Sequence, residues 1–552
     1  MKTSEGFNKL VDSFAIFTFD LNLGQTCEYA YPPASFSAED LKAISMLSFP
    51  DSQTVNSNNF DCVYTFSYRS GKPSPTGLPQ PLQSQQPSGE RFHQCYVYFR
   101  QVEDMSNPRG YYQKSFVMIS SRSRTFQNSD EMFRLVRSIG NKFYLAEESG
   151  FGREILVDSY NHLEKHGISF RRGSYGEIAG RLSPISTRSS EISDPGSPSR
   201  SSCSIDTVYS LFEGLWHLWE ALMVGLPVLV YAPEDVDVCS HTVLAVSRLI
   251  QPIQYLGDIR PFLSIFDEDY SSFRSPNAGA CVVGITSPMA LSQLIGSFSV
   301  IIVISTCPLD TMTDSTAFLQ VAASPSGSIY VADAITSVSS GTRTRVSSLT
   351  SRIMFSAVSE GYRLALASDA IYLSKRIVTG LHMGDAIVSN RVNRSVIQRH
   401  FTLLTKDFLI PFVEYVETDA SVLPSNAFGE TPKTKSFSPS GFVRQLSVGV
   451  GRNLSQLSQE KLRSLYSAFI KTESFRVWLR AGQDKANQEA IVAHSQTVIR
   501  AVTGDRVMWL SDTERKRAKA RALALASALG DTNLIRQLEE AVAILSINSC
   551  TT

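Results

Sequence analysis

The strongest hydrophobic pattern in the chain lies in residues 215–270. Apolar residues recur at three- and four-residue spacing over residues 215–223, which predicts a helix. The apolar run that follows, residues 228–231, has no polar alternation, as expected of a strand buried on both faces of a parallel sheet. A second helix is predicted next, which Asp235 or Ser240 can cap. A helix, a buried strand and a helix in succession predict an α/β layer.

The same succession continues along the chain. Residues 282–285 and 300–304 are further short apolar runs, and a Thr-Ser-Pro sequence after the first of them predicts the start of a helix. Three buried strands with helices between them predict a small parallel sheet. Residues 324–351 are rich in Ser, Thr and Gly, and we expect them to be irregular.

The first 170 residues show a different pattern, in which short strands are separated by turn residues. The predicted strands are residues 14–20, 28–31, 60–69, 95–102 and 109–121. The predicted helices are residues 37–47, a helix that begins at Asp130, and residues 153–166. We expect a meander of antiparallel strands with helices on one side, which is an α+β layer.

The last third of the chain has apolar residues at helical spacing almost throughout. The predicted helices are residues 359–378, 391–415, 457–479, 488–502, 512–529 and 531–547. A proline-containing break at residues 418–440 divides this region. Two segments elsewhere, residues 70–91 and 171–204, have compositions that favour a flexible hairpin insertion and a disordered linker. The linker is either a plain tether or a site of phosphorylation at its Ser-Pro pairs.

Composition and charge narrow the functional classes. A chain of 552 residues suggests roughly three or four domains. Lys plus Arg and Asp plus Glu both number 52, so no strong overall field would attract nucleic acid or an anionic membrane. The eight cysteines form no CxxC pair, which favours free thiols in a reducing compartment. Neither a secretory signal nor a membrane-spanning run is recognisable, so we expect a cytoplasmic protein.

A search for catalytic and ligand-binding motifs finds none that is complete. The chain has no GxxxxGK[ST] phosphate loop and no GxSxG nucleophile elbow, and the Gly-Val-Gly at residues 449–451 lacks a preceding strand and a third glycine. His162, Glu164 and His166 do not share one helical face, so we interpret them as a surface helix rather than a zinc site. We therefore expect no catalytic residue, cofactor or metal.

Two charged runs have ordinary interpretations. Residues 267–269, Asp-Glu-Asp, cannot all face one ion, so we expect a solvated turn, with a partner contact as the alternative. The basic run at residues 514–521 lies on a predicted helix, where such a run is usually a solvated face.

Three stretches carry a resemblance to a known family. FTFDLNLGQTCEYAYPP at residues 17–33, followed by LSFPDS at residues 47–52, resembles the opening of DENN-domain proteins. RGYYQKSFVMIS at residues 109–120 is similar to the strand pair that closes their N-terminal lobe. LWEALMVGLPVLVYAP and YLGDIRPFLSIFD, within residues 215–270, are similar to their central module. A fourth stretch, SVIQRHFTLLTKDFLIPFVEYV, resembles the helical portion of the DENN domain-containing protein 6 branch.

The resemblance implies a division of the chain into lobes. It implies a longin-like N-terminal lobe, a central α/β lobe and an all-α C-terminal lobe, in agreement with the α+β, α/β and helical order above. The corresponding segments are residues 10–170, a linker at 171–204, the central lobe at 205–320, a Ser-rich connection at 321–352, and the helical region at 353–548.

The resemblance also implies a function. It implies guanine nucleotide exchange on a Rab-family small GTPase in vesicle trafficking, by a protein that partner binding recruits to endosomal or vesicle membranes. Such exchange needs no acid, base or nucleophile, which fits the failed motif search. A Rab effector or trafficking scaffold without exchange activity is the alternative, and an enzyme with an unrecognised small-molecule site is a third hypothesis.

The family has no catalytic signature to transfer, so candidate partner-binding residues come from polar positions beside the matched motifs. They are Asp258, Arg260, Asp267, Glu268 and Tyr270. The alternative for the first two is structural, because Asp258 and Arg260 can pair with each other or cap a helix to hold the fold.

Overall fold

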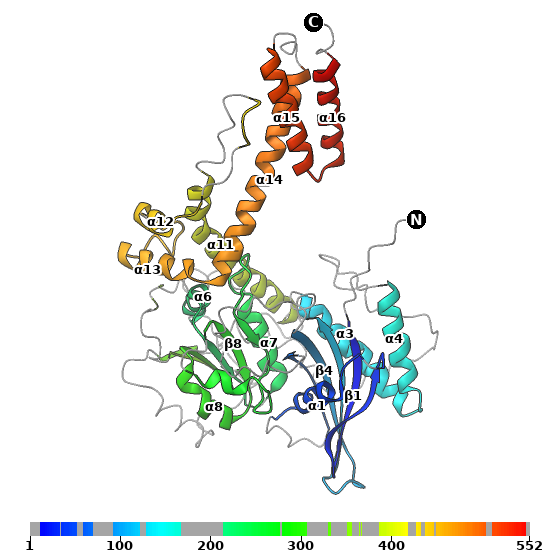
Figure 1. Cartoon of the computed structure of the whole chain (residues 1–552). Coiled ribbons are helices and arrows are strands. Elements are labelled where there is room, and N and C mark those ends of the chain that lie inside the picture. Colours follow the sequence, from blue (N-terminus) through cyan, green and yellow to red (C-terminus); the bar gives the residue numbers. More distant parts are fainter. Residues whose placement is uncertain are drawn as a thin grey trace. The chain divides into compact units, whose positions relative to one another are not determined.

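The structure is a computed structural model, and its described residues fall into two compact units (Figure 1). The described residues are 11–33, 35–51, 59–69, 92–121, 128–166, 214–233, 235–275, 279–305, 329–332, 350–355, 364, 366, 386–417, 427–431, 436–446, 449–503 and 510–547. The first unit comprises Met1–Leu249 and Gly257–Arg399, and the second comprises Ile250–Leu256 and His400–Thr552. The expected insertion at 70–91 and the linker at 171–204 lie outside the described residues.

The N-terminal part of the first unit contains a five-stranded antiparallel sheet. Its strands are β1 (Ser13–Asp20), β2 (Gly24–Tyr31), β3 (Phe60–Arg69), β4 (Phe92–Glu103) and β5 (Tyr111–Ser121). All five predicted strands are present, but the predicted meander is wrong, because the order is β2-β1-β5-β4-β3. β5 pairs with β1, with Ile16 opposite Phe116. The hairpin of β1 and β2 therefore lies next to β5, the central strand of the sheet, and not next to β3.

Helices cover both faces of this sheet, so the expectation of helices on one side is wrong. The helices are α1 (Ala38–Leu47), α3 (Ser129–Glu147) and α4 (Gly152–His166). α3 and α4 pack on the face that carries Phe14 and Phe116. α1 packs on the opposite face, where Ile44 joins Phe17. Consecutive residues of β3, β4 and β5 are buried, which requires an apolar cover on each side.

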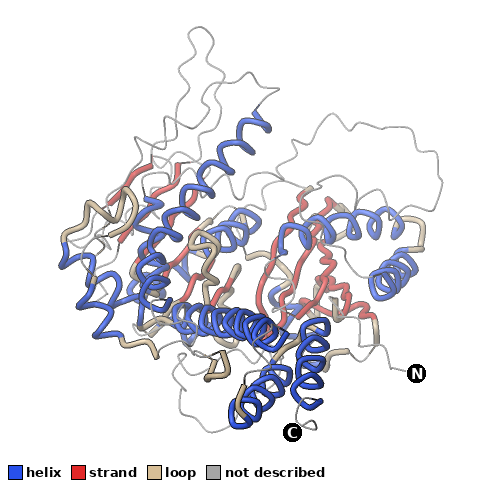
Figure 2. The backbone as a smooth tube through the Cα atoms, turned by 90° about the horizontal axis from the view of Figure 1, so that it is seen from above, coloured by secondary structure: helices blue, strands red, loops and turns tan. Residues whose placement is uncertain are grey.

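The second sheet of the first unit has six strands and appears in Figure 2 as a separate group. Its strands are β6 (Val228–Tyr231), β7 (Asp258–Arg260), β8 (Cys281–Ile285), β9 (Val300–Ser305), β10 (Ile329–Ala332) and β11 (Thr350–Phe355). The order is β10-β11-β9-β6-β8-β7, and β9, β6 and β8 are parallel, as the pattern predicts. β7, which the pattern did not predict, is a fourth parallel strand. β10 and β11 add an antiparallel edge.

The antiparallel edge corrects one expectation. Residues 324–351 are not irregular throughout, because β10 and the start of β11 lie within them. β10 has only four residues, Ile-Tyr-Val-Ala, so it is hidden within a Ser-rich segment of sequence. It is stabilised by pairing with the six-residue strand β11.

The helices beside this sheet begin and end at the residues that the pattern favours. They are α6 (Leu215–Val224), α7 (Val236–Ser247) and α8 (Pro288–Leu294). Asp235, rather than Ser240, caps α7 by accepting two backbone N–H groups, and Ser287 caps α8. Gly225 ends α6 at a φ of 75°, a left-handed conformation that glycine adopts without strain.

Helix α7 packs on β3, the edge strand of the first sheet, and on strands β6, β7 and β8 of the second sheet. Val236, in its first turn, packs into the core on the α1 face. Leu244, two turns later, packs into the core on the α3 and α4 face. Ser67 of β3 also donates a hydrogen bond to the carbonyl oxygen of Ile259 in β7, at 3.2 Å. α7 therefore covers a strand edge that would otherwise be open to pairing.

The second unit is helical. Its helices are the later part of α11 (Ala386–Glu417), α12 (Pro439–Gln445), α13 (Gln459–Ile470), α14 (Glu473–Thr503), α15 (Asp512–Ala528) and α16 (Thr532–Ile547). Aromatic rings of α11, α12 and α13 form one core, in which Phe408 stacks on Tyr466 and Phe412 on Phe442, each at 4.3 Å. The end of α14 packs with α15 and α16 in another.

Two predicted helices of the second unit have the wrong bounds. Residues 457–479 are not one helix, because α13 ends at Ile470 and Thr472 then caps α14 by accepting from the N–H of Phe475. Residues 488–502 are the end of α14, whose middle is polar on all sides and so lacks an apolar stripe. The predicted helix at 359–378 lies outside the described residues except at 364 and 366. Among the described helices, none has the length and apolar character to cross a membrane.

Candidate functional site

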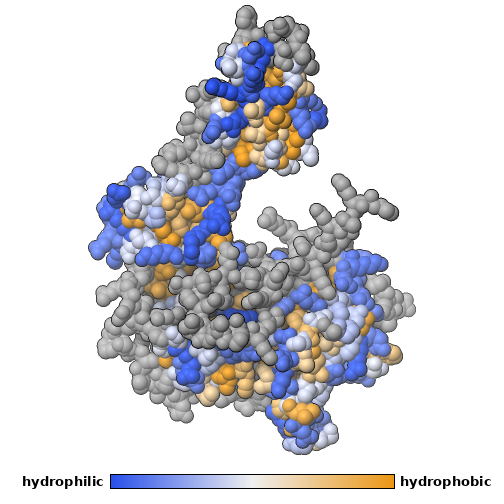
Figure 3. Space-filling view, viewed as in Figure 1, coloured by the Kyte–Doolittle hydropathy of each residue, from blue (hydrophilic) through white to orange (hydrophobic). Residues whose placement is uncertain are grey.

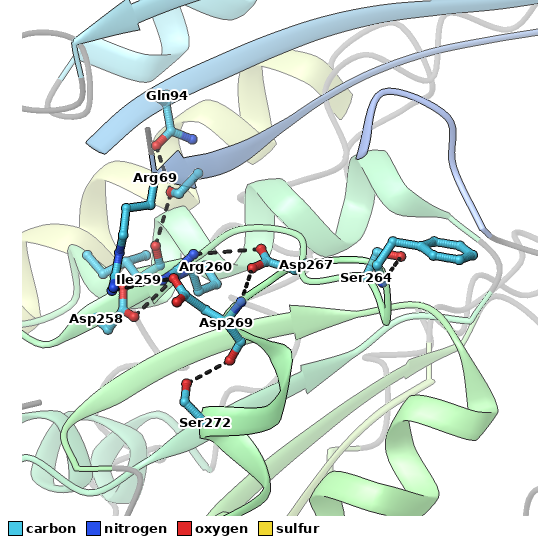
Figure 4. Close-up of polar contacts among 11 residues, drawn as sticks. Arg69, Gln94, Asp258, Ile259, Arg260, Ser264, Asp267, Asp269 and Ser272 are labelled. Carbon is cyan, nitrogen blue, oxygen red and sulfur yellow. Dashed lines mark hydrogen bonds and ion pairs between the residues drawn. The ribbon is translucent and has the colours of Figure 1, made fainter. Parts of the chain in front are cut away.

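A buried arginine, Arg260, lies at the centre of the predicted site (Figure 4). Its side chain is only 1% exposed, and three aspartates surround it. The Nε atom lies 3.1 Å from Oδ2 of Asp258, and Nη2 lies 2.5 Å from Oδ2 of Asp269. Nη1 lies 3.7 Å from Oδ2 of Asp267. Asp258 and Arg260 can pair directly because residues two apart on a strand face the same side.

The first sheet contributes to the same cluster. Arg69, at the end of β3, lies 3.4 Å from Oδ2 of Asp269. The guanidinium groups of Arg69 and Arg260 both lie over the ring of Phe92, at 4.9 and 5.1 Å from its centroid. We call these residues, with Asp258 and Asp267, the Arg260 cluster. Through the ion pair of Arg69 with Asp269, this cluster connects the turn after β7 to the first sheet.

Opposing charges set the protonation states in the Arg260 cluster. Burial alone would lower the pKa of Arg260, but the carboxylates of Asp258, Asp267 and Asp269 outweigh it and raise that pKa. Burial raises the pKa of Asp267, because the attraction of Arg260 offsets only part of the desolvation. The guanidinium of Arg260 therefore stays charged at neutral pH.

The start of the turn is held by a second set of contacts. Ser264 donates to Oδ2 of Asp51 at 3.1 Å, and Thr286 donates to Oδ1 of the same carboxylate at 2.6 Å. Burial raises the pKa of Asp51, while these two hydrogen bonds act in the opposite direction. The turn at residues 264–270 is thus fixed at both ends, by hydroxyl groups on Asp51 and by the Arg260 cluster.

The outer side of this turn borders a small cavity. The cavity has a volume of about 70 Å³ and is lined by α1, the end of β3 and residues 266–269. Phe266, at its rim, is 52% exposed, and Glu268 is exposed beside it. A cavity of this size is far below the several hundred Å³ of a typical small-molecule site, so it does not fit a nucleotide.

The five predicted residues therefore divide into three groups. Asp258, Arg260 and Asp267 come together in the Arg260 cluster, and the pair that the structural alternative requires is present. Glu268 is exposed at the rim of the cavity. Tyr270 is 7% exposed and its hydroxyl donates to Oε1 of Gln293 at 3.2 Å. Partner binding by these residues stays a prediction.

The expected solvated turn at residues 267–269 is wrong for two of its three members. The side chains of Asp267 and Asp269 are only 7% and 21% exposed, because both face Arg260. Sequence reasoning missed Asp269 and Arg69, and also Phe266. The alternation of Asp, Glu and Asp next to a strand that contains an arginine was the available signal, since positions 267 and 269 can face one side and 268 the other.

The other candidate motifs give no site. His162, Glu164 and His166 lie exposed on α4. Over the part of the chain that the structure describes, no group of three or more His, Cys, Asp and Glu residues is arranged to hold a metal ion.

Comparison with known proteins finds relatives, two of which match about nine-tenths of the chain. No family model matches the chain. The protein DENND6A of Gallus gallus is 25% identical over 526 residues, which cover 89% of this chain and 82% of that protein. The protein DENND6B of Homo sapiens is 24% identical over 525 residues, covering 90% and 83%. The DENND6 homolog of Dictyostelium discoideum is 28% identical over 319 residues, covering 48% and 41%. The similarity predicted from the sequence motifs is confirmed.

Proposed function

From the premise that this chain is similar to the DENN domain-containing protein 6 branch, we propose that it is a guanine nucleotide exchange factor for a Rab-type small GTPase in vesicle trafficking. The observation that carries the proposal is the similarity over 89% and 90% of the chain to DENND6A and DENND6B. The protein itself is cytoplasmic in this proposal, and the GTPase recruits it to endosomal or vesicle membranes.

The proposal assigns the lobes of the family to this chain. Residues 10–170 form the longin-like lobe, and residues 205–320 form the central lobe, with 171–204 as the linker. The Ser-rich connection at 321–352 leads into the helical region at 353–548, with its break at 418–440. The antiparallel sheet and the parallel strands β6 to β9 support this division of the first unit, whereas β10 and β11 extend the second sheet beyond residue 320.

The turn at residues 264–270 is the proposed contact with the GTPase. Phe266 supplies an exposed apolar group and Glu268 a charge, while the Arg260 cluster holds the turn rigid behind them. In this arrangement Glu268 touches the partner, whereas Asp258, Arg260 and Asp267 position it. Tyr270 fixes the end of the turn through Gln293. A rigid contact surface loses little conformational entropy on binding.

The mechanism requires differential binding and no covalent chemistry. A factor that binds the nucleotide-free GTPase more tightly than the GDP-loaded form lowers the affinity for GDP by the same ratio, because the two equilibria are linked. The contact pulls the switch regions away from the nucleotide, and GTP then displaces the factor. In this mechanism the nucleotide is bound by the partner.

The direct test measures GDP release. Each member of a Rab panel is loaded with a fluorescent GDP and mixed with the full chain, and we expect faster release from at least one of them. No acceleration on any member would contradict exchange activity. Tighter binding to the GTP-loaded than to the nucleotide-free form would instead indicate a Rab effector or scaffold.

Matched substitutions test the proposed surface. Phe266→Ala combined with Glu268→Lys should abolish the acceleration and leave the melting temperature unchanged, because both side chains are exposed. Met289→Ala on α8 is the control, since Met289 is 53% exposed against 52% for Phe266, and it should retain full activity. Equal activity in all variants would exclude this turn as the contact.

A further inference from the structure

Helix α15 presents an unusually basic outer surface. Five of its residues within positions 515–521 are Lys or Arg, and Lys516, Arg517 and Lys519 are exposed. The residues that it buries against α14 and α16 are alanines and leucines. The helix therefore turns its small apolar side chains inward and its cations toward solvent.

The acid nearest to these cations has another role. Glu514 completes a capping box with Ser511, in which its carboxylate accepts from the Ser511 N–H at 2.9 Å. Arg517 lies close enough to lower the pKa of Glu514. Among the residues that the structure describes, no ion pair involves Lys516 or Lys519. Their charges are therefore available to an external partner.

An exposed leucine extends the same side of the helix. Leu523 is 49% exposed, and it lies seven residues after Lys516 and four after Lys519, so the three share one side. They span roughly 10 Å along the axis. On the face shown in Figure 3, strongly hydrophilic and apolar residues lie side by side over the helices at the C-terminal end. We call Lys516, Lys519 and Leu523, together with Arg517 on the adjoining exposed flank of the helix, the basic face of α15.

The neutral total charge of the protein hides this local excess. Residues 400–552 contain 19 Lys and Arg against 15 Asp and Glu, whereas the whole chain has 52 of each. Lys516 and Lys519 are three residues apart and therefore neighbours on the helix surface, within about one Debye length of 8–10 Å at physiological salt, so an anionic surface would interact with both charges together. The zero net charge of the whole chain therefore does not describe the local electrostatic potential at α15.

We propose that the basic face of α15 binds the surface of an anionic phospholipid bilayer. The three cations attract acidic headgroups, as polybasic segments do, and the exposed side chain of Leu523 contacts the headgroup region. The small side chain of Ala520 lies between Lys519 and Leu523 in the helix and lets the backbone approach the surface. α15 contains no aromatic residue on which a base could stack, so single-stranded nucleic acid is a poorer fit.

Vesicle flotation with the full chain and without any GTPase tests this proposal. We expect binding to phosphatidylcholine vesicles that contain roughly 30% phosphatidylserine, weak binding to phosphatidylcholine alone, and release by high salt. Combined Lys516→Gln, Arg517→Gln and Lys519→Gln should lower the partition coefficient roughly a hundred-fold, since each cation near such a surface contributes about five-fold. Leu523→Ala should lower it by a few-fold.

A variant with the same change of net charge is the control. Lys461→Gln, Arg463→Gln and Arg480→Gln remove three exposed cations from helices α13 and α14 of the same unit. This control should bind vesicles within a few-fold of the unchanged protein. Equal loss in both triple variants would show that net charge alone acts and would overturn the proposal. Indifference to phosphatidylserine, or displacement from vesicles by a short RNA or an acidic peptide at lower concentration, would also overturn it.

The result is independent of the proposed exchange activity. Vesicle binding is measured without a GTPase, so a protein that fails to release GDP can still bind the bilayer. A protein that exchanges GDP in solution can equally fail to bind vesicles. The melting temperatures of both triple variants, which we expect to be unchanged, verify that each is folded.

Discussion

The Arg260 cluster and the basic face of α15 are both concentrations of charge, but they differ in their access to water. Arg260 is 1% exposed and faces three carboxylates. Lys516, Arg517 and Lys519 are exposed on the outside of a helix. The charge of Arg260 is paired with aspartates of the same chain, whereas the charges on α15 face solvent and can interact with another molecule. Sequence composition alone does not separate the two.

The difference has an energetic meaning. A buried charge that loses its partner pays the full desolvation penalty, so breaking such a cluster is strongly destabilising. An exposed cation remains hydrated whatever its neighbours do, and its removal changes stability little. We therefore expect substitutions in the Arg260 cluster to act on folding and those on α15 to act on binding.

The largest effect is expected for Arg260→Ala. It leaves Asp258, Asp267 and Asp269 close together without the cation between them, which should lower the free energy of unfolding by about 3–5 kcal/mol. Urea unfolding followed by circular dichroism measures this loss. Glu268→Gln, in the same turn but exposed, is the control and should change stability by less than about 0.5 kcal/mol. Similar losses of unfolding free energy in the two variants would contradict a stabilising role of the buried cluster.

A smaller and pH-dependent effect is expected for Asp51→Asn. Because burial raises the pKa of Asp51, the folded protein keeps this proton to a higher pH than the unfolded chain does. Stability therefore falls as the pH rises from about 4 through the raised pKa of the folded state. Asn cannot ionise, so the decrease in unfolding free energy that Asp51 causes between pH 4.5 and pH 7 should be absent from the variant. An unchanged decrease would exclude Asp51 as a contributor.

The smallest effect on stability is expected for the triple substitution of Lys516, Arg517 and Lys519 by Gln. Gln is a good helix former and these side chains are exposed, so the unfolding free energy should change by less than about 0.5 kcal/mol. Thermal unfolding checks this value. A large loss would show that the cations stabilise the helix bundle and would remove the contrast with the Arg260 cluster.

Individual helices and strands were predictable from the sequence where a short stretch of residues determines them. The strands of the first sheet, the start of α8 at the Thr-Ser-Pro sequence, and the parallel strands β6, β8 and β9 follow from periodicity and capping chemistry. The strand order and the helices on both faces of the first sheet did not follow, because they depend on which segments pair after long connections. The short strand β10 depends in the same way on its neighbour.

The candidate site shows the same limit at the level of side chains. Sequence motifs selected Asp258, Arg260 and Asp267, and these residues do come together. Exposure could not be inferred, since a charged residue next to a strand is usually solvated and the fold alone determines that Arg260 is buried. Arg69 was missed because it precedes Asp269 by 200 positions, and only the packing of the first sheet brings them together.

The packing of α7 on β3 has a consequence for the order of events during synthesis. All five strands of the first sheet have been made when the ribosome reaches Ser121, but α7 ends only at Ser247. At about 5–20 residues per second, the sheet waits roughly 6–25 s for the helix that covers its edge. During that interval the nascent chain exposes an open strand to its neighbours on the same messenger RNA.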